Sequence, residues 1–148
     1  MSLLPPGAYG GELTCVQEIM GTYGNSKQVL TGIVRLSSED MQVTLFAEMA
    51  RIMTIKYGAL GMEYDFSPLI PVANIRPEYV LFDIQLTYFP AEAINKALPK
   101  GMTFSEEGAV RTLYRGDQAI VKIVRNGEDI EFINNERSYS YLIKQQEN

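Results

Sequence analysis

The sequence predicts an α+β fold in which a curled antiparallel sheet of about ten strands forms an incomplete β-barrel with a helical plug. Three observations lead to this prediction. Short β-patterned segments, about five on each side, flank one helical region between Ala73 and Pro99. The turns between these segments are short, as expected for neighbouring antiparallel strands. The helical region is apolar on nearly all sides, so it needs cover from several directions.

The first five strands are predicted between residues 12 and 66. Turn residues such as Gly24-Asn25-Ser26 separate them, because Gly and Asn tolerate positive φ. Pro68 and Pro71 end this region, since proline cannot donate to a sheet ladder. The predicted strands are Glu12–Tyr23, Lys27–Leu36, Met41–Met49, Arg51–Tyr57 and Leu60–Phe66.

The helical region is predicted to form two helices. The longer one spans Ile75–Phe89, and Pro77 suits its first turn, where a missing N–H costs nothing. Pro90 ends or kinks this helix, and a shorter helix over Ala91–Leu98 follows. One apolar stripe of the long helix contains Ile75, Tyr79, Phe82, Leu86 and Phe89.

Five more strands are predicted after the helices. Asn126-Gly127 between two of them is typical of a two-residue hairpin. A strongly twisted sheet of about ten strands tends to curl or to split. Curling around the helices gives the incomplete barrel, whereas splitting gives the alternative, a two-sheet sandwich capped by the helices. The predicted strands are Met102–Glu106, Val110–Arg115, Gln118–Arg125, Asp129–Ile133 and Ser138–Ile143.

A chain of 148 residues is expected to form one domain. We assign residues 1–11 to an extended leader, 12–144 to the half-barrel domain, and 145–148 to a frayed polar tail. The net charge of −5 disfavours nonspecific binding of nucleic acid. Cys15 is the only cysteine, which excludes an intrachain disulfide.

The side chains offer little catalytic chemistry. The chain has no histidine, the commonest general base and metal ligand, and a single cysteine argues against zinc, haem or iron–sulfur ligation. Carboxylate pairs, as used by glycosidases, remain conceivable at Asp129 with Glu131 and at Glu106 with Glu107. A solvated strand face is the more ordinary interpretation of both pairs. We therefore expect a protein that is not an enzyme and needs no cofactor or metal.

A cavity for an apolar ligand is predicted between the curled sheet and the long helix. Methionines and aromatic residues gather in the flanking strands, and flexible methionine suits surfaces that accept varied apolar ligands. Each candidate also fits a plain core role, because strand register decides which side chains point inward. The candidate lining residues are Val43, Leu45, Met49, Met53, Tyr57, Tyr64, Phe66, Tyr79, Phe82, Leu86, Phe89, Phe104, Phe132, Tyr139 and Tyr141.

Basic residues within the predicted strands are candidates for a charged rim. Such a rim would hold an anionic head group beside an apolar cavity. An ordinary solvated outer face explains them equally simply. These residues are Arg51, Lys56, Arg111, Lys122 and Arg125.

Several short motifs, spread over nearly the whole chain, carry a resemblance to a known family. They are Leu4-Pro5-Pro6 with Tyr9-Gly10, Pro68-Leu69-Ile70-Pro71, Asp83-Ile84-Gln85-Leu86 with Phe89-Pro90, Arg111 with Leu113-Tyr114-Arg115, and Ile130 to Asn134 with Tyr139-Ser140-Tyr141. In these motifs the chain resembles a family of small, uncharacterised bacterial outer-membrane lipoproteins. These lipoproteins are related in form to the lipoprotein carriers LolA and LolB.

The resemblance implies a half-barrel with a helical lid and an apolar interior at the periplasmic face of the outer membrane. It also implies peripheral attachment through a lipidated cysteine preceding the sequence given, and a genomic setting of fatty-acid or aryl-polyene synthesis. We therefore expect non-catalytic binding and transfer of a lipid, acyl chain or lipoprotein, with a lipoprotein or biosynthetic protein as partner. The alternatives are a structural lipoprotein that docks a partner by a sheet edge, and a hydrolase with paired carboxylates.

Overall fold

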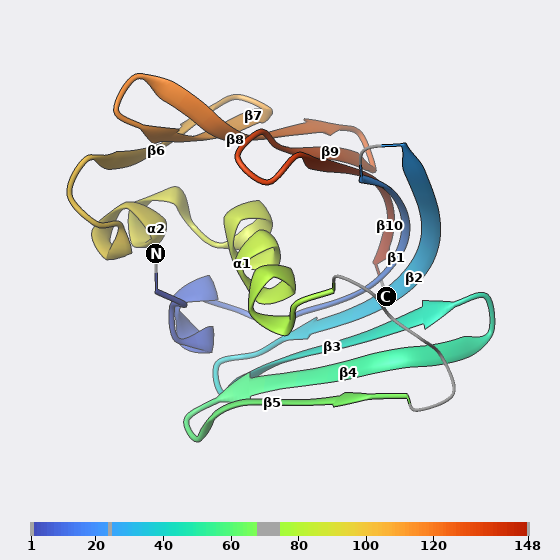
Figure 1. Ribbon diagram of the computed structural model, residues 1–148. Coiled ribbons are helices and arrows are strands. Elements are labelled where there is room, and N and C mark those ends of the chain that lie inside the picture. The colour runs from blue at the N-terminus through green and yellow to red at the C-terminus, as the bar shows by residue number, and fades with distance from the viewer. Residues whose placement is uncertain (1, 24, 68–74, 148) are drawn as a thin grey trace.

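The computed structural model describes residues 2–23, 25–67 and 75–147, which form one ten-stranded antiparallel sheet with two helices on its concave side (Figure 1). The strand order is β5-β4-β3-β2-β1-β10-β9-β8-β7-β6, so the sheet is open and β5 and β6 are its edges. The prediction of a curled ten-stranded sheet with helices inserted between strands five and six is confirmed. The alternative of a two-sheet sandwich is wrong, because the first and last strands pair and join both halves into one sheet.

The strand boundaries agree with the predicted ones to within one or two residues, except at the end of the last strand. The Asn126-Gly127 hairpin is present, with Asn126 paired to Asp129 and Gly127 at a φ of 64°. The strands are β1 Leu13–Tyr23, β2 Ser26–Leu36, β3 Asp40–Ala47, β4 Ala50–Gly58, β5 Gly61–Phe66, β6 Met102–Glu107, β7 Val110–Arg115, β8 Gln118–Asn126, β9 Asp129–Asn134 and β10 Tyr139–Glu147.

Regular secondary structure extends into both segments that were predicted as leader and tail. Strand β10 continues to Glu147 because β1 pairs with it along its whole length, down to Cys15 opposite Glu147. Asn148 lies outside the described residues. Near the N-terminus, Pro6–Tyr9 form a 3₁₀ helix, η1, and the Tyr9 ring lies 5.8 Å from the ring of Phe89.

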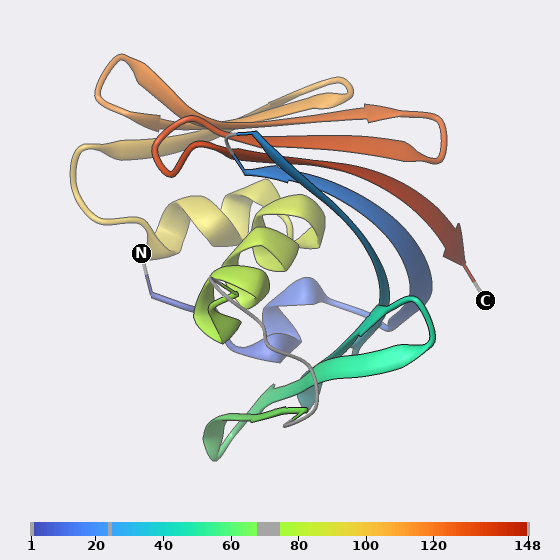
Figure 2. The same cartoon turned by 45° about the vertical axis from the view of Figure 1, so that its right-hand side comes forward.

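Two features let the sheet curl around the helices. Strands β1 and β2 are long and bend through the middle of the sheet, as both views show (Figures 1 and 2). Register irregularities interrupt β3 at Leu45/Phe46 and β7 at Leu113/Tyr114, and such irregularities increase local bending and twist. The concave face of this curl is where the helices pack.

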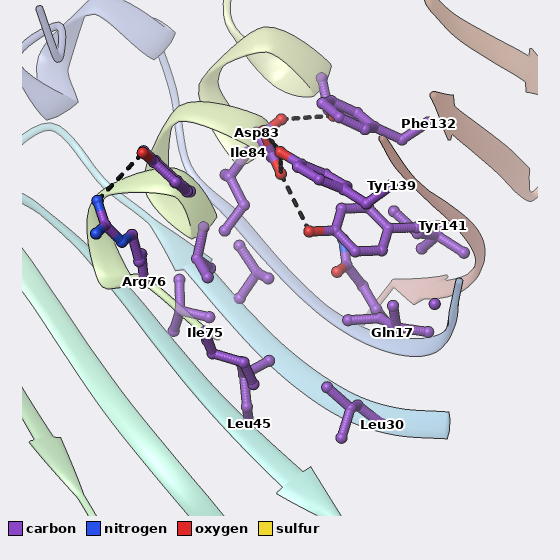
Figure 3. A pocket seen from close by; sticks show the side chains of 18 of the residues that line it. Gln17, Leu30, Leu45, Ile75, Arg76, Asp83, Ile84, Phe132, Tyr139 and Tyr141 are labelled. Atoms are coloured by element: carbon purple, nitrogen blue, oxygen red, sulfur yellow. Dashed lines mark hydrogen bonds between the residues drawn. The ribbon is translucent and has the colours of Figure 1, made fainter. Parts of the chain in front are cut away.

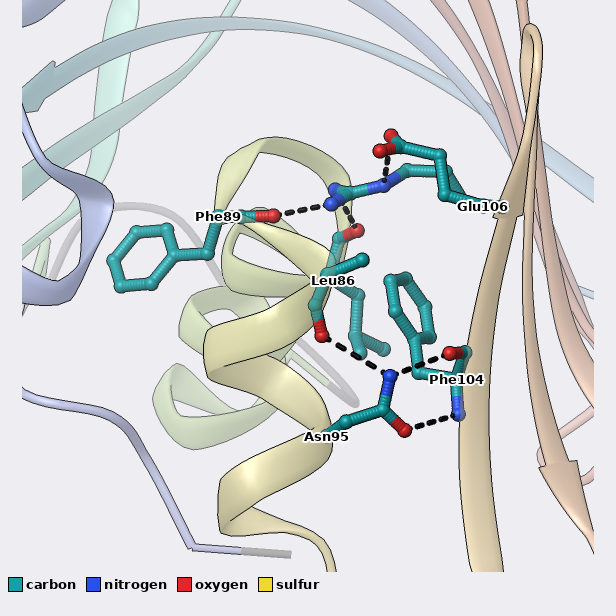
Figure 4. Close-up of polar contacts among 7 residues, drawn as sticks. Leu86, Phe89, Asn95, Phe104 and Glu106 are labelled. Carbon is teal, nitrogen blue, oxygen red and sulfur yellow. Dashed lines mark hydrogen bonds and ion pairs between the residues drawn. The ribbon is translucent and has the colours of Figure 1, made fainter.

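The helices are α1, Pro77–Tyr88, and α2, Ala91–Ala97. Pro77 stands at the first helical position as predicted, and the chain becomes extended at Phe89, directly before Pro90. Helix α2 covers the edge strand β6. The Asn95 amide donates to the Phe104 carbonyl at 2.6 Å and accepts from the Phe104 N–H at 2.9 Å (Figure 4).

Helix α1 is buried on several sides, as expected. The buried side chains are not only those of the predicted apolar stripe. Leu86 and Phe89 are buried, whereas Phe82 is only half-buried. Polar side chains at Asp83, Gln85 and Thr87 are buried instead. Buried polar groups are tolerated where hydrogen bonds replace those lost to water, and all three of these side chains have such partners.

Candidate ligand-binding cavity

A cavity of about 470 Å³ lies between α1 and the concave face of the sheet (Figure 3). Strands β1, β2, β3, β9 and β10 contribute its walls, and aliphatic and aromatic side chains dominate its lining. The lining residues are Gln17, Ile19, Gly21, Gln28, Leu30, Val34, Val43, Leu45, Ile75, Arg76, Tyr79, Val80, Asp83, Ile84, Thr87, Tyr88, Phe132, Arg137, Tyr139, Tyr141 and Ile143.

Strand alternation places the apolar part of this lining. In β3, Met41, Val43 and Leu45 are buried and alternate with half-buried neighbours, because successive side chains of a strand point to opposite faces. Leu30 and Val34 occupy the same face of β2. Gly32 lies between them, and a Cβ there would sit 3.2 Å from Ile19 Cδ1 and 3.4 Å from Leu45 Cδ2.

A buried carboxyl group, that of Asp83, forms part of the cavity wall. The Tyr139 hydroxyl lies 2.7 Å and 3.0 Å from the two carboxyl oxygens of Asp83, and the Tyr141 hydroxyl lies 3.3 Å from one of them (Figure 3). Burial raises the pKa of Asp83 to about 7, although these hydrogen bonds and the charge of Arg137 act in the opposite direction. Near neutral pH this carboxyl therefore exchanges between its neutral and charged forms.

A second polar chain lies deeper along α1. The Gln17 amide donates to the Tyr88 hydroxyl at 2.6 Å, and that hydroxyl donates to the Gln145 side-chain oxygen. Burial raises the pKa of Tyr88, so the phenol stays protonated and can donate. Beyond it lies a second, more polar pocket of about 390 Å³, which Thr87 and Tyr88 also line. The hydrogen-bonded side chains of Gln17, Tyr88 and Gln145 therefore lie between the apolar cavity and the more polar pocket.

Two arginines and a tyrosine stand at the N-terminal end of α1. The Arg137 guanidinium carbon lies 3.5 Å from the centre of the Tyr79 ring, and that of Arg76 lies 5.4 Å from it. Arg76 also donates to the Tyr79 hydroxyl at 3.3 Å. All three residues line the cavity, and both arginines are exposed, so they mark its contact with solvent.

The basic residues predicted to form a rim have other roles or positions. Arg51 pairs with Asp65 at 3.0 Å on the β5 edge, and Lys56 and Lys122 are exposed away from the cavity. Arg125 lines the second pocket, with its guanidinium 6.0 Å from the Tyr88 ring. Their strand positions fit solvated faces, whereas the two arginines that line the cavity, Arg76 and Arg137, come from a helix start and a hairpin turn.

Arg111, the fifth of these residues, holds the C-terminal end of α1. It donates to the Leu86 carbonyl at 2.6 Å and to the Phe89 carbonyl, and its Nε lies 3.0 Å from Glu106 (Figure 4). Its guanidinium carbon lies 5.0 Å from the centre of the Phe104 ring. Burial lowers its pKa, while Glu106 favours the charged form. Arg111 thus satisfies carbonyls that a helix end otherwise leaves without partners.

The structure brings only part of the predicted lining together. Six candidates line the cavity: Val43, Leu45, Tyr79, Phe132, Tyr139 and Tyr141. Four others are buried in the surrounding core: Met53, Leu86, Phe89 and Phe104. The remaining five are exposed or half-buried away from it: Met49, Tyr57, Tyr64, Phe66 and Phe82.

The local structure explains why some candidates lie outside the cavity. Strand β3 ends at Ala47, and Glu48 turns the chain at a φ of 55°, which leaves Met49 95% exposed. Tyr64 and Phe66 lie on the edge strand β5, which β4 separates from the cavity-lining strand β3. The lining residues missed by sequence reasoning include Leu30, which continues the inward alternation of β2 from Val34 and could have been found from it.

Paired carboxylates do not meet in the cavity. Glu131 is exposed, Asp129 is half-buried, and neither lines either of the two pockets. Glu106 forms an ion pair with Arg111.

Across residues 2–23, 25–67 and 75–147, no group of three or more His, Cys, Asp or Glu side chains is placed to hold a metal ion. None of the described helices has the length and apolarity to cross a membrane.

The fold and the cavity together define an open β half-barrel that encloses a ligand-sized apolar space beside a helix. Residues 14–147 match a family described as a protein of unknown function (DUF3261). The chain therefore belongs to this family, and the match includes all ten strands and both α-helices apart from the first residue of β1. No curated protein matches the sequence.

Proposed function

We propose that the protein binds an acyl chain, of a lipid or of a lipoprotein, in the cavity beside α1 and transfers it without catalysis. The observation that carries this proposal is the cavity itself, about 470 Å³ in volume and lined mainly by apolar side chains. Pockets of about 300–1,000 Å³ with mostly apolar walls are the usual sites of small ligands. Each buried CH₂ of a chain contributes about 0.8 kcal/mol, so such a space supports useful affinity.

The polar groups of the wall favour a ligand with an apolar body. Asp83 is engaged by two tyrosine hydroxyls, and Tyr88 is engaged by two glutamine amides. Because these groups satisfy one another, they make few demands on a ligand. Leu30, Leu45 and Ile84 supply non-directional contacts between them, and such contacts suit a flexible hydrocarbon.

We also propose a structural relative for this protein and a place in the cell. We infer a relation in form to the lipoprotein carriers LolA and LolB, and attachment to the periplasmic face of the outer membrane by a lipidated cysteine upstream of the sequence given. An open sheet with helices on its concave side supports this relation. A lipoprotein or a biosynthetic protein would then deliver or receive the acyl chain. Labelling of the full-length gene product with an alkyne fatty acid, followed by membrane fractionation, tests the anchor.

A pair of neighbouring substitutions tests ligand binding. Leu30 lines the cavity, whereas Val29 is 60% exposed on the other face of the same strand. Leu30→Trp fills the cavity and should weaken binding of a fluorescent fatty acid at least about tenfold, a loss of about 1.4 kcal/mol. Val29→Trp is the matched control and should bind like the wild type. Urea unfolding of both variants confirms that they are folded.

Mass spectrometry of extracts from the purified protein completes this test. Co-purified acyl lipids and saturable uptake that Leu30→Trp alone abolishes support the proposal. A protein without lipid and without saturable uptake contradicts it. That outcome favours a structural role in which the edge strand β5, with Tyr64 54% exposed, pairs with a partner chain.

A further inference from the structure

The mouth of the cavity carries positive charge in a protein whose net charge is −5. Arg76 precedes α1, and Arg137 lies in the turn between β9 and β10, so the fold brings together two residues that are distant in sequence. Both line the same cavity and both lie near one ring, that of Tyr79. This placement joins cationic groups directly to an apolar space.

The structure holds both arginines in place at this mouth. The backbone N–H of Arg137 donates to the Asn134 side-chain oxygen at 2.7 Å, and Asn134 is itself buried. The Arg137 guanidinium stacks on Tyr79 at 3.5 Å. A guanidinium that uses its face for stacking keeps the N–H donors at its edge available for an anion. Arg76 is anchored to the same ring through the Tyr79 hydroxyl.

Acidic side chains balance these charges only in part. Arg76 has Glu78 at 3.9 Å. Among the described residues no carboxylate lies within ion-pair distance of Arg137, and its charge acts on the more deeply buried Asp83, whose pKa of about 7 leaves that carboxyl only partly charged near neutral pH. By contrast, Arg51 and Arg111 each meet a carboxylate at 3.0 Å. Residues 68–74, which precede the mouth in sequence, contain no charged side chain. Two arginines on one ring repel each other, and an anion between them would offset that repulsion.

From these observations we propose that the ligand is a monoacyl amphiphile whose single anionic group is bound by Arg76 and Arg137 at the mouth. The inference rests on the proposed function, because it takes the acyl chain to lie in the cavity behind them. Ile75, Val80 and Ile84 continue the lining inward from the arginines. A carboxylate and a phosphate share the chemistry required, since arginine donates to either through parallel N–H groups.

The test compares three ligands with the same acyl chain: oleate, lysophosphatidate and the neutral monoacylglycerol. Competition against a fluorescent fatty acid gives the affinity of each for the intact chain. We expect at least one anionic ligand to bind about tenfold or more tightly than the neutral one, and the preferred anion identifies the head group. The preference should weaken as ionic strength rises, because exposed charges are screened by salt.

The double variant Arg76→Glu/Arg137→Glu should remove this preference, because it weakens binding of the anionic ligands about tenfold more than binding of monoacylglycerol. A glutamate just before a helix is electrostatically favourable, so the variant should fold, and its thermal unfolding checks this. The control is Arg35→Glu/Lys122→Glu, which makes the same change in net charge at two exposed residues outside the cavity. This control should retain the wild-type preference.

The outcomes separate the two proposals. If all three ligands bind the wild type equally, or if the double variant weakens all three alike, the head-group inference is wrong while acyl binding stands. If none of the three binds, the proposed function fails and the inference fails with it. If the control loses the preference to the same extent, net charge rather than the mouth is responsible, and the inference is overturned.

Discussion

The two ends of helix α1 are held in different ways. At the C-terminal end, Arg111 donates to two backbone carbonyls and Gln85 forms two hydrogen bonds of 2.9 Å with the backbone of Leu4. At the N-terminal end, the N-cap Arg76 makes no side-chain cap hydrogen bond, and the helix borders a cavity. The C-terminal end is fixed by hydrogen bonds to the protein interior, and the N-terminal end faces the cavity and solvent.

This difference suggests how a ligand enters. Segments with few buried directional contacts open at low cost, whereas a helix end whose carbonyls are satisfied in the core opens only with the rest of the domain. Under the proposed function, an acyl chain would enter beside Ile75 and Tyr79, while the hydrogen bonds from Arg111 to the carbonyls of Leu86 and Phe89 keep α1 on the sheet.

Removing Arg111 should have the largest effect on stability. Arg111→Leu leaves the carbonyls of Leu86 and Phe89 without their donor, and we expect it to lower the free energy of unfolding by about 4 kcal/mol. Urea unfolding followed by circular dichroism measures this. Arg125→Leu, at an exposed residue, is the control and should change stability by less than about 0.5 kcal/mol. Equal effects of the two substitutions would contradict the view that Arg111 holds the C-terminal end of α1.

Asp83 should make stability depend on pH. Its pKa of about 7 in the folded state exceeds the ordinary 3.8, so between these values the folded protein binds the additional proton. Stability from this group is therefore greatest at low pH, falls as pH rises toward 7, and levels off above it. From about pH 4.5 to about pH 7.5 the loss amounts to about 3 kcal/mol.

Asp83→Asn isolates this contribution, since an amide does not titrate. Between about pH 4.5 and about pH 7.5, the free energy of unfolding of the variant should rise by about 3 kcal/mol relative to that of the wild type. Thermal and urea unfolding at several pH values measure it. Asp117→Asn, at an exposed turn, is the control and should follow the wild type throughout. A constant difference between Asp83→Asn and wild type would mean that Asp83 is already charged at low pH.

Replacing Gln85 should release the N-terminal segment. Gln85→Leu keeps the size of the side chain but loses both bonds to Leu4, and we expect a cost of about 2 kcal/mol. Hydrogen exchange at the Leu4 amide should accelerate while that of β8 changes little. Gln118→Leu, at an exposed position, is the control. Unchanged protection at Leu4 would show that Gln85 does not hold the N-terminal segment in place.

Local sequence signals predicted most of the fold. Turn residues such as Asn126-Gly127, and the proline at 90, mark boundaries that depend on nearby atoms only, so strands such as β8 and β9 were placed correctly. The predicted break at Pro68 and Pro71 lies outside the described residues. The pairing of β1 with β10 and the ordering of η1 depend on contacts between distant segments. Composition made residues 145–148 look like a tail, yet Gln145, Gln146 and Glu147 pair with β1.

The cavity was predictable in location but not in detail. Strand alternation correctly grouped Val43 with Leu45, but it gave no warning that the chain would turn before Met49. A lone carboxylate at Asp83 inside an apolar helix was a usable signal for a buried polar site. Arg76 and Arg137 carry no such local signal, because only the folded sheet brings the β9–β10 turn to the start of α1.

Paramagnetic broadening by a spin-labelled stearic acid tests most directly whether an acyl chain occupies the cavity. Methyl spectra of the intact protein should lose intensity at Leu30, Leu45 and Ile84 on addition of the ligand. Methyl groups of Ile94 and Leu113, which lie outside the cavity lining, should keep theirs. Broadening confined to exposed methyls such as those of Leu60, or spread evenly over the protein, would contradict an acyl-binding cavity.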